Sequence, residues 1–210
     1  MHFALFSLHF GNAIVTLKWS QNDFRCVGEG VSNRRKTMVS RNVFTNYDEP
    51  KATETILYLA NRVSSPEKYT ICKMIYLADK MSLEKYGRLI FGESYAAMPQ
   101  GATPSKAYNL LNKNIRNPSS ICVDGNNVAA LREANLDYLS ASDRDCLDQI
   151  IKLYDKNGVK MRDAAHDAAW QEAWDNRGTL NSVPMPITRI VSTFPDSAEL
   201  LDYLAECGVG

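Results

Sequence analysis

An acidic residue inside a strongly apolar helical pattern is the feature of this sequence that most restricts its fold. Residues 69–86 carry apolar side chains at helical spacing, and Asp79 falls within the same stripe. An unpaired carboxylate on an apolar helix face costs several kcal/mol, so Asp79 needs hydrogen-bond donors. We expect Asp79 to accept backbone N–H bonds from the loop at 92–105 or from a helix that starts at Pro104. The alternative is that Asp79 belongs to a binding surface or a reactive cleft.

Capping residues and turn signals divide the chain into short elements. Asp48, with Pro50 in the first turn, predicts the start of one helix, and Gly87 predicts the end of a helix that opens at Pro66. The further expected elements are a loop at 87–103 with one or two short strands at 89–91 and 95–98, a helix begun by Thr103 and Pro104, a β-hairpin at 121–131, a helix begun at Ser140 or Ser142 and ending near Asn157 and Gly158, short helices at 161–165 and 167–174, a loop at 178–193, and a last helix at 195–206. This pattern predicts a mainly α fold: a compact multi-helix domain with a small β-hairpin and short strands.

The composition is that of a globular protein without an obvious cofactor. The chain has 210 residues, 45% hydrophobic and 23% charged, which fits one domain with an attached tail or two small domains. Its 24 basic residues balance 24 acidic ones, so no overall field attracts it to nucleic acid or to anionic lipid. The five cysteines are widely spaced without a CxxC pair, and there are three histidines. We therefore expect reduced thiols in a cytoplasmic protein with no metal and no cofactor.

The first 37 residues differ from the rest. Residues 1–17 are apolar but interrupted by polar side chains, lack a basic segment in front, and are short for a membrane span, so we expect neither a signal peptide nor a membrane anchor. Residues 20–37 lack periodicity and end in Arg34-Arg35-Lys36-Thr37 before Met38. Two interpretations stay open: a disordered basic tail, or translated upstream sequence in which two AGG arginine codons form a ribosome-binding site before Met38. Without its five basic and two acidic residues, 19 basic and 22 acidic residues remain in a single domain at 38–210.

A proline-bracketed segment is the second candidate for function. Residues 95–104 contain Pro99 and end in Pro104, and they carry Tyr95 and Met98. Aromatic and methionine side chains on a rigid loop form a contact surface that loses little entropy when a partner binds. The alternative is that this loop only covers the core. The glycine in it is not part of a phosphate-binding loop, because the chain has neither GxxxxGK[ST] nor GxGxxG.

Two other function classes have weaker support. His166 lies between Asp163 and Asp167 and could act as a base, but no nucleophile motif accompanies it, so a capping or packing role fits better. Trp170 and Trp174 form one helical ridge that is expected to be core. Nucleic-acid binding is disfavoured, because the cations of the central helix are spread around it without a clean stripe: Lys68, Lys73, Lys80, Lys85 and Arg88.

Three runs of residues resemble a known family. They are KMIYLAD at 73–79, YGR at 86–88 and YAAMPQG at 95–101. This succession resembles the pattern of the Panacea domain, found in SocA-like antitoxins and in phage-associated GepA-like proteins. The segments at 139–147 and 165–170 are similar to the terminal region of that family, so the resemblance spans about 53–174. One departure stands out: where the family commonly has Gly-Pro-Val, this chain has Gly101-Ala102-Thr103, with the proline only at Pro104.

The resemblance implies a non-enzymatic antitoxin of a toxin–antitoxin system, often prophage-associated. Such a domain neutralises a toxin encoded nearby by direct protein–protein binding, and some relatives act as adaptors that present the toxin to a protease. The alternatives are a DNA-binding autoregulator or, less in keeping with the sequence, a hydrolase-like enzyme centred on Asp79 and His166. The residues that we expect to bind the partner or to organise the loop are Tyr76, Asp79, Arg88, Tyr95, Met98, Pro99, Gly101, Pro104 and Tyr108.

Overall fold

The computed structural model describes residues 5–10, 13–18, 46–113 and 120–209. The chain divides into two compact units, Met1–Val39 and Ser40–Gly210, which are described separately. In the first unit, β1 (Leu5–Phe10) and β2 (Ala13–Lys18) pair as an antiparallel hairpin. The other residues of the predicted N-terminal tail lie outside the described ranges, so both interpretations of that tail stay predictions. No helix in the described ranges is long and apolar enough to cross a membrane.

The start of α1 (Glu49–Ala60) and the end of α2 (Lys68–Tyr86) lie where the capping residues predict, whereas α2 begins two residues after the predicted start at Pro66. The Asp48 side chain accepts from the Lys51 N–H at the start of α1, whose first turn contains Pro50. Helix α2 ends at Gly87, which adopts a left-handed φ of 63° and donates its N–H to the Leu83 carbonyl. A left-handed C-terminal residue is inexpensive only for glycine, so Gly87 fixes the exit of the chain from α2.

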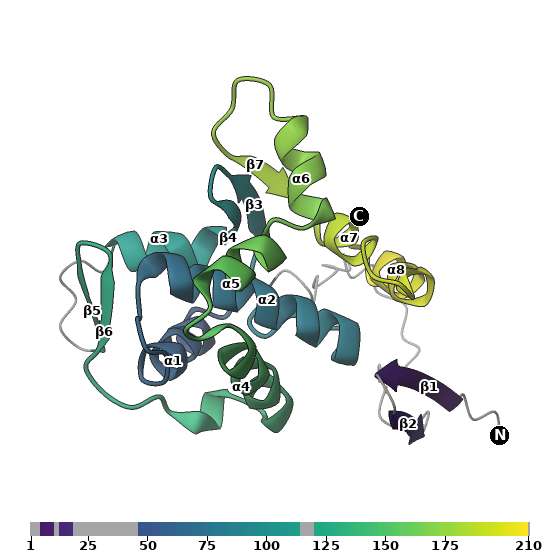
Figure 1. The fold of residues 1–210 in the computed structure, drawn as a ribbon, viewed down its shortest axis with the longest axis horizontal. Coiled ribbons are helices and arrows are strands. Elements are labelled where there is room, and N and C mark those ends of the chain that lie inside the picture. The colour runs from purple at the N-terminus through teal and green to yellow at the C-terminus, as the bar shows by residue number, and fades with distance from the viewer. Residues whose placement is uncertain (1–4, 11–12, 19–45, 114–119, 210) are drawn as a thin grey trace, which may run out of the picture. The chain divides into compact units, whose positions relative to one another are not determined.

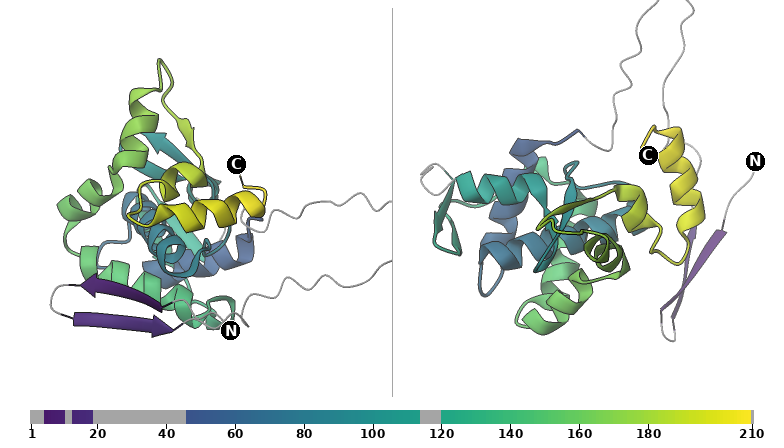
Figure 2. Two further views of the ribbon diagram at one scale, coloured as in Figure 1. Left: turned by 90° about the vertical axis from the view of Figure 1, so that its right-hand side faces the viewer. Right: turned by 90° about the horizontal axis from the view of Figure 1, so that it is seen from above.

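Helix α2 is the central element of this unit (Figures 1 and 2). It packs on α4 (Ala141–Tyr154), on α5 (Gly158–Ala165) and on β4 (Gly101–Pro104), with further contacts to α1 and to a helix at 105–113. All nine residues from 71 to 79 are buried. The expected single apolar stripe is therefore too narrow a description, because neighbours cover α2 on several sides. Lys73, counted above among the cations spread around this helix, is among the buried residues.

A three-stranded antiparallel sheet has the order β4-β3-β7, with β3 at Tyr95–Met98 and β7 at Val183–Met185. Pro104 pairs with Tyr95, and Pro184 pairs with Ala96. Because proline has no N–H, the ladder bonds in both places must be made by the flanking pairs.

Strand β7 corrects the prediction of a loop at 178–193. Thr103 and Pro104 belong to β4 and do not begin the next helix, which starts one residue later; residues 89–91 form no strand.

The remaining elements follow the predicted order. Helix α3 (Ser105–Lys113) leads towards the hairpin of β5 (Ile121–Asp124) and β6 (Asn127–Ala130), and the 3₁₀ helix η2 (Leu136–Tyr138) precedes α4. Ser140 and Asp143 form a reciprocal capping box at the start of α4, which decides between the two predicted serines. The last elements are α6 (Ala168–Asp175), α7 (Ile187–Val191), which lies in the predicted loop, and α8 (Ser197–Glu206). The predicted mainly α fold with minor β structure is confirmed.

Candidate functional site

Asp79 is buried and is held by two donors from the segment that follows α2. Its side chain is 1% exposed, Oδ1 accepts from the Ile90 N–H at 2.8 Å, and Oδ2 accepts from the Tyr95 hydroxyl at 2.6 Å. Burial raises the pKa of Asp79 to about 7, although both hydrogen bonds act in the opposite direction. The carboxyl group fixes the chain between 90 and 95 against α2. The expected backbone donors at 92–105 are not the ones used, since the N–H comes from Ile90.

Glu93 makes the contacts that the sequence analysis assigned to Asp79. It is 1% exposed, and its carboxylate accepts the backbone N–H groups of Lys106 at 3.0 Å and Ala107 at 2.7 Å, at the start of α3, and that of Ser94 at 2.7 Å. The first N–H groups of a helix have no partner inside it, and the positive end of the helix dipole favours a carboxylate. A glutamate twelve residues upstream of α3 carries no local capping signature, so sequence reasoning missed it.

Two tyrosines connect Asp79 to the start of α6. The rings of Tyr76 and Tyr95 meet edge to face with their centroids 5.1 Å apart. The Tyr76 hydroxyl donates to Asp167 Oδ2 at 2.7 Å, and Lys80 forms an ion pair with the same oxygen. Asp167 also caps α6, because its Oδ1 accepts from the Trp170 N–H at 3.0 Å. One face of α2 therefore positions both the segment after it and the start of α6, where Asp167 lies 91 residues beyond Tyr76.

The turn between β3 and β4 packs against the end of α5 and the start of α6. The Trp170 indole N–H donates to the Met98 carbonyl at 2.9 Å, and the His166 ring stacks on Trp170 with centroids 4.2 Å apart. Gly101 has a φ of +97°, and a Cβ there would lie 2.4 Å from His166 Cδ2, so no other residue fits without displacement. Gly101 is buried, Met98 is partly exposed and Pro99 is exposed. This turn is a rigid, well-supported projection.

The remaining members of the predicted loop are largely internal. Tyr95 and Pro104 are buried, whereas Tyr108 is half-buried against the core. The buried Lys73 donates from Nζ to the Ala102 carbonyl at 2.7 Å, on the edge of β4 that faces away from β3. Burial lowers the pKa of Lys73 to about 8. This amine occupies a carbonyl that an edge strand otherwise leaves unpaired, which closes that edge to other strands.

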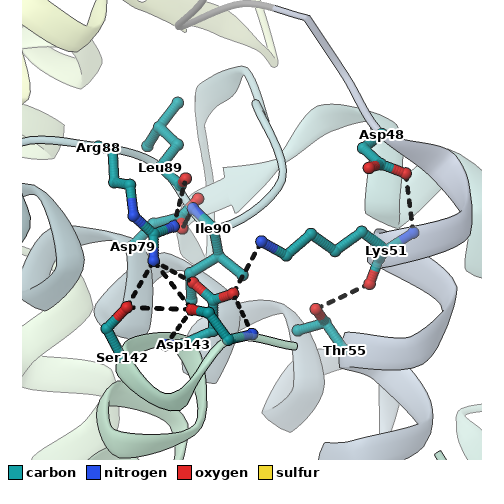
Figure 3. Close-up of polar contacts among 10 residues, drawn as sticks. Asp48, Lys51, Thr55, Asp79, Arg88, Leu89, Ile90, Ser142 and Asp143 are labelled. Carbon is teal, nitrogen blue, oxygen red and sulfur yellow. Dashed lines mark hydrogen bonds and ion pairs between the residues drawn. The ribbon is translucent and has the colours of Figure 1, made fainter. Parts of the chain in front are cut away.

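Arg88 follows the C-terminal end of α2 and belongs to a second polar cluster, which surrounds Asp143 and is drawn together with Asp79 in Figure 3. Its Nη2 lies 2.7 Å from Oδ1 of Asp143, whose other oxygen lies 2.7 Å from Lys51 Nζ. Asp143 is fully buried, and although burial raises its pKa, hydrogen bonds from Lys51, Ser140 and Arg88 outweigh this and hold the pKa below the usual value. Arg88 also donates to the hydroxyl of Ser142 at 2.7 Å. This cluster joins α1, the end of α2 and the start of α4.

The predicted residues thus fall into one connected group and one separate cluster. Tyr76, Asp79, Tyr95 and the turn at 98–101 are linked through shared contacts, whereas Arg88 joins the cluster of Asp143. Asp79 and His166, the pair of the hydrolase alternative, share no hydrogen bond in the described ranges: Asp79 binds Ile90 and Tyr95, and His166 packs on Gly101 and Trp170. The described ranges also contain no group of three or more His, Cys, Asp or Glu side chains arranged to hold a metal ion.

These features define a mainly α domain in which the polar residues of the central helix hold its own loop and sheet in place. Residues 71–171 match the family model described as "Antitoxin SocA-like, Panacea domain". The match runs from the first turn of α2 into α6 and includes all nine residues that the sequence predicts to bind the partner or to organise the loop. The resemblance to the Panacea domain is therefore confirmed for residues 71–171, which are similar to the domain of SocA-like antitoxins. No curated protein and no solved structure matched the chain.

Proposed function

We propose that this protein is an antitoxin that neutralises a protein toxin by direct binding. The match of residues 71–171 to the antitoxin family is the observation that carries the proposal. Similarity to an antitoxin domain favours a non-enzymatic role in general terms. The proposed setting is a bacterial cytoplasm in which the toxin gene lies beside this one, with delivery of the bound toxin to a protease as a further variant of the same activity.

In this proposal, the turn between β3 and β4 forms part of the surface that contacts the toxin. Pro99 and Gln100 are exposed at its tip, and Met98 is partly exposed beside them. The turn is held from below by Trp170 and His166 and, through Tyr95, by Asp79. A projection whose conformation is already fixed loses little entropy when a partner binds, which increases affinity. In this proposal Tyr76, Asp79, Tyr95, Gly101 and Pro104 position the turn and do not touch the partner.

Co-expression with the small open reading frame adjacent to the gene tests the proposal. We expect that frame to arrest growth when expressed alone, growth to recover when this protein is present, and the two proteins to purify together. Recovery without a stable complex would exclude neutralisation by simple occlusion. An adjacent frame that is toxic and is not neutralised overturns the antitoxin proposal for that pair.

A variant pair tests the contact surface separately. The double substitution Pro99→Ala with Gln100→Ala removes the exposed tip and is expected to weaken co-purification at an unchanged melting temperature. The control is Asp124→Ala with Asn126→Ala, since these residues are exposed at the tip of the other hairpin, between β5 and β6. Equal losses of binding in both variants contradict a specific role for the β3–β4 turn.

A further inference from the structure

The corner between α4 and α5 combines unpaired positive charge with exposed apolar side chains. Lys152 lies in the last turn of α4, Lys156 in the connection and Lys160 in the first turn of α5, and all three are exposed. None of them forms an ion pair within the described ranges, although seven other cations do. Leu153 and Val159 are 44% and 64% exposed beside them. Single exposed leucine and valine side chains are ordinary on a protein surface, but beside three lysines they add apolar contact area to a positive surface.

Asp155, the acidic residue of this corner, already accepts two hydrogen bonds from Ser64. Asp155 accepts from the backbone N–H of Ser64 at 2.8 Å and from its hydroxyl at 2.6 Å. This pair of bonds brings the α1–α2 connection, with the exposed Arg62, next to the α4–α5 connection. The local balance is therefore positive, in a segment 38–210 that has three more acidic than basic residues. A positive surface on an otherwise acidic domain selects for a negatively charged partner.

The backbone of the corner contains one unfavourable conformation, in the turn that follows α4 and is closed by the Asn157 N–H on the Tyr154 carbonyl at 2.9 Å. Lys156 has a φ of 65°, and it is the one non-glycine residue with positive φ in the described ranges. Glycine or asparagine adopts this conformation at lower cost than lysine. Strained non-glycine residues of this kind are concentrated at functional sites.

Helix α5 connects this corner to the proposed contact turn. Its first turn carries Val159 and Lys160, and the residue after its last turn, His166, packs on Gly101 of the β3–β4 turn. Eight helical residues at a rise of about 1.5 Å span about 12 Å. Both surfaces therefore fit within one interface of ordinary size, which covers roughly 800 Å² on each partner.

We infer that the α4–α5 corner binds an acidic segment of the toxin that carries apolar side chains, next to the partner's contact with the β3–β4 turn. The inference rests on the proposed antitoxin function and adds the chemistry of the partner to it. A polypeptide is favoured over nucleic acid, because Leu153 and Val159 have no use in binding phosphates and because Tyr154, the aromatic residue of the corner, is half-buried with Lys160 Nζ 5.6 Å from its ring centre.

A binding assay with defined probes tests the corner without the toxin. The probes are a short amphipathic peptide of glutamate, alanine and leucine, the same peptide with lysine in place of glutamate, and a short DNA duplex, each followed by fluorescence anisotropy over a range of NaCl concentrations. We expect the acidic peptide to bind the full chain, to bind more weakly as salt increases, and to be preferred over both other probes. Stronger binding of the duplex or of the lysine peptide overturns the inference.

Matched variants locate the binding site. Lys152→Gln with Lys160→Gln is expected to weaken binding of the acidic peptide about fivefold, as two surface charge pairs allow. The control Lys85→Gln with Lys106→Gln also removes two exposed lysines and is expected to leave binding unchanged. For the apolar part, Val159→Ser is compared with Leu180→Ser, since these side chains are 64% and 58% exposed. Equal effects of the variants and their controls contradict the assignment.

Lys156→Gly separates binding from folding. Because glycine relieves the positive φ, we expect a higher melting temperature together with weaker binding of the acidic peptide. A variant that is more stable and binds equally well shows that Lys156 is not part of the surface. In the growth assay, a Lys152→Gln, Lys160→Gln variant that neutralises the toxin fully overturns this inference and leaves the antitoxin proposal intact. Failure of the unmodified protein to neutralise overturns the antitoxin proposal itself.

Discussion

Two buried aspartates, Asp79 and Asp143, solve the same problem with different partners. Both are almost completely buried, at 1% and 0% exposed. Asp143 lies between the cations Lys51 and Arg88, so its charge is balanced. Among the described residues, the donors to Asp79 are both neutral: one hydroxyl and one backbone N–H. Hydrogen bonds from charged groups hold the pKa of Asp143 below its usual value. Burial raises the pKa of Asp79, whose donors are neutral, to about 7.

The difference teaches what each residue contributes to the domain. Asp143 joins three helices through charge, and its contribution depends on the carboxylate staying ionised. Asp79 orients the chain between Ile90 and Tyr95 through hydrogen bonds that a neutral carboxyl group also makes. The first is therefore expected to behave as an ionic connection, and the second as a polar group that the core tolerates at a cost whenever it is charged.

The largest expected effect comes from removing Asp143. The substitution Asp143→Ala leaves Lys51 and Arg88 without their common partner and also breaks the capping box of α4, so we expect a loss of about 3 kcal/mol in the free energy of unfolding. Urea denaturation measures this change. The control is Asp145→Ala two residues later, where the carboxylate is exposed and pairs with Lys85 at 3.7 Å, and where a loss below about 0.5 kcal/mol is expected. Similar losses in both variants would break the comparison.

Local sequence patterns identify both aspartates but not the residues that contact them from distant parts of the chain. Asp79 is conspicuous because it interrupts an apolar helix, and Ser140 indicates the capping box to which Asp143 belongs. Nothing local predicts that Lys51 and Arg88 reach Asp143, because these cations come from α1 and from the end of α2. Glu93 is missed for the same reason. Long-range partners depend on how the helices pack, and the periodicity of a single segment does not predict that packing.

The sheet shows the same division between local and long-range information. Tyr95–Met98 was predicted as a strand from its apolar residues, and Asp124 to Asn127 predicted the turn of the other hairpin. Strand β7 was missed, because three residues containing a proline have no recognisable strand pattern. Its pairing with β3 depends on α6, which packs on both strands. The fold class follows from the sequence, but the connections that build the candidate site do not.

The second prediction uses pH to separate the two aspartates. Asp79 has a folded pKa of about 7 and a usual value of 3.8, so the protein is expected to lose stability as pH rises between these values, by at most about 1.4 kcal/mol per pH unit. Asp143 acts in the opposite direction, since its stabilisation is present above pH 3.8 and is lost as pH falls through its lowered pKa. Asp79→Asn, which cannot ionise, is expected to match the unmodified protein near pH 4 and to be more stable by about 2 kcal/mol at pH 6.

Urea denaturation at several pH values follows both variants. Asp145→Asn serves as the control for Asp79→Asn, because its carboxylate is exposed and its removal is expected to leave the pH profile unchanged. If Asp79→Asn is less stable than the unmodified protein at pH 7.5, the carboxylate of Asp79 is stabilising in its charged form, and the contrast with Asp143 disappears.

The third prediction concerns the donors of Asp79. Tyr95→Phe removes the hydroxyl that donates to Oδ2 at 2.6 Å in the buried core, so a loss of about 1.5 kcal/mol is expected. Tyr58→Phe is the matched variant, since Tyr58 donates to Asp148 at 2.7 Å and Asp148 is exposed to water. Water replaces that hydroxyl, so we expect a loss of about 0.5 kcal/mol. Thermal and urea unfolding compare them, and equal losses would show that the burial of Asp79 does not matter.

The smallest expected effect is the removal of one of the two cations of Asp143. Arg88 keeps part of its side chain in water, and Lys51 remains 2.7 Å from the carboxylate, so Arg88→Gln is expected to cost about 1 kcal/mol. Arg88→Lys restores the charge but not the planar fork that also reaches Ser142, and should recover only part of this loss. Chemical denaturation in low and high salt measures both. A loss for Arg88→Gln as large as that for Asp143→Ala would mean that Lys51 alone cannot balance the buried charge, so the ionic connection would depend on both cations together.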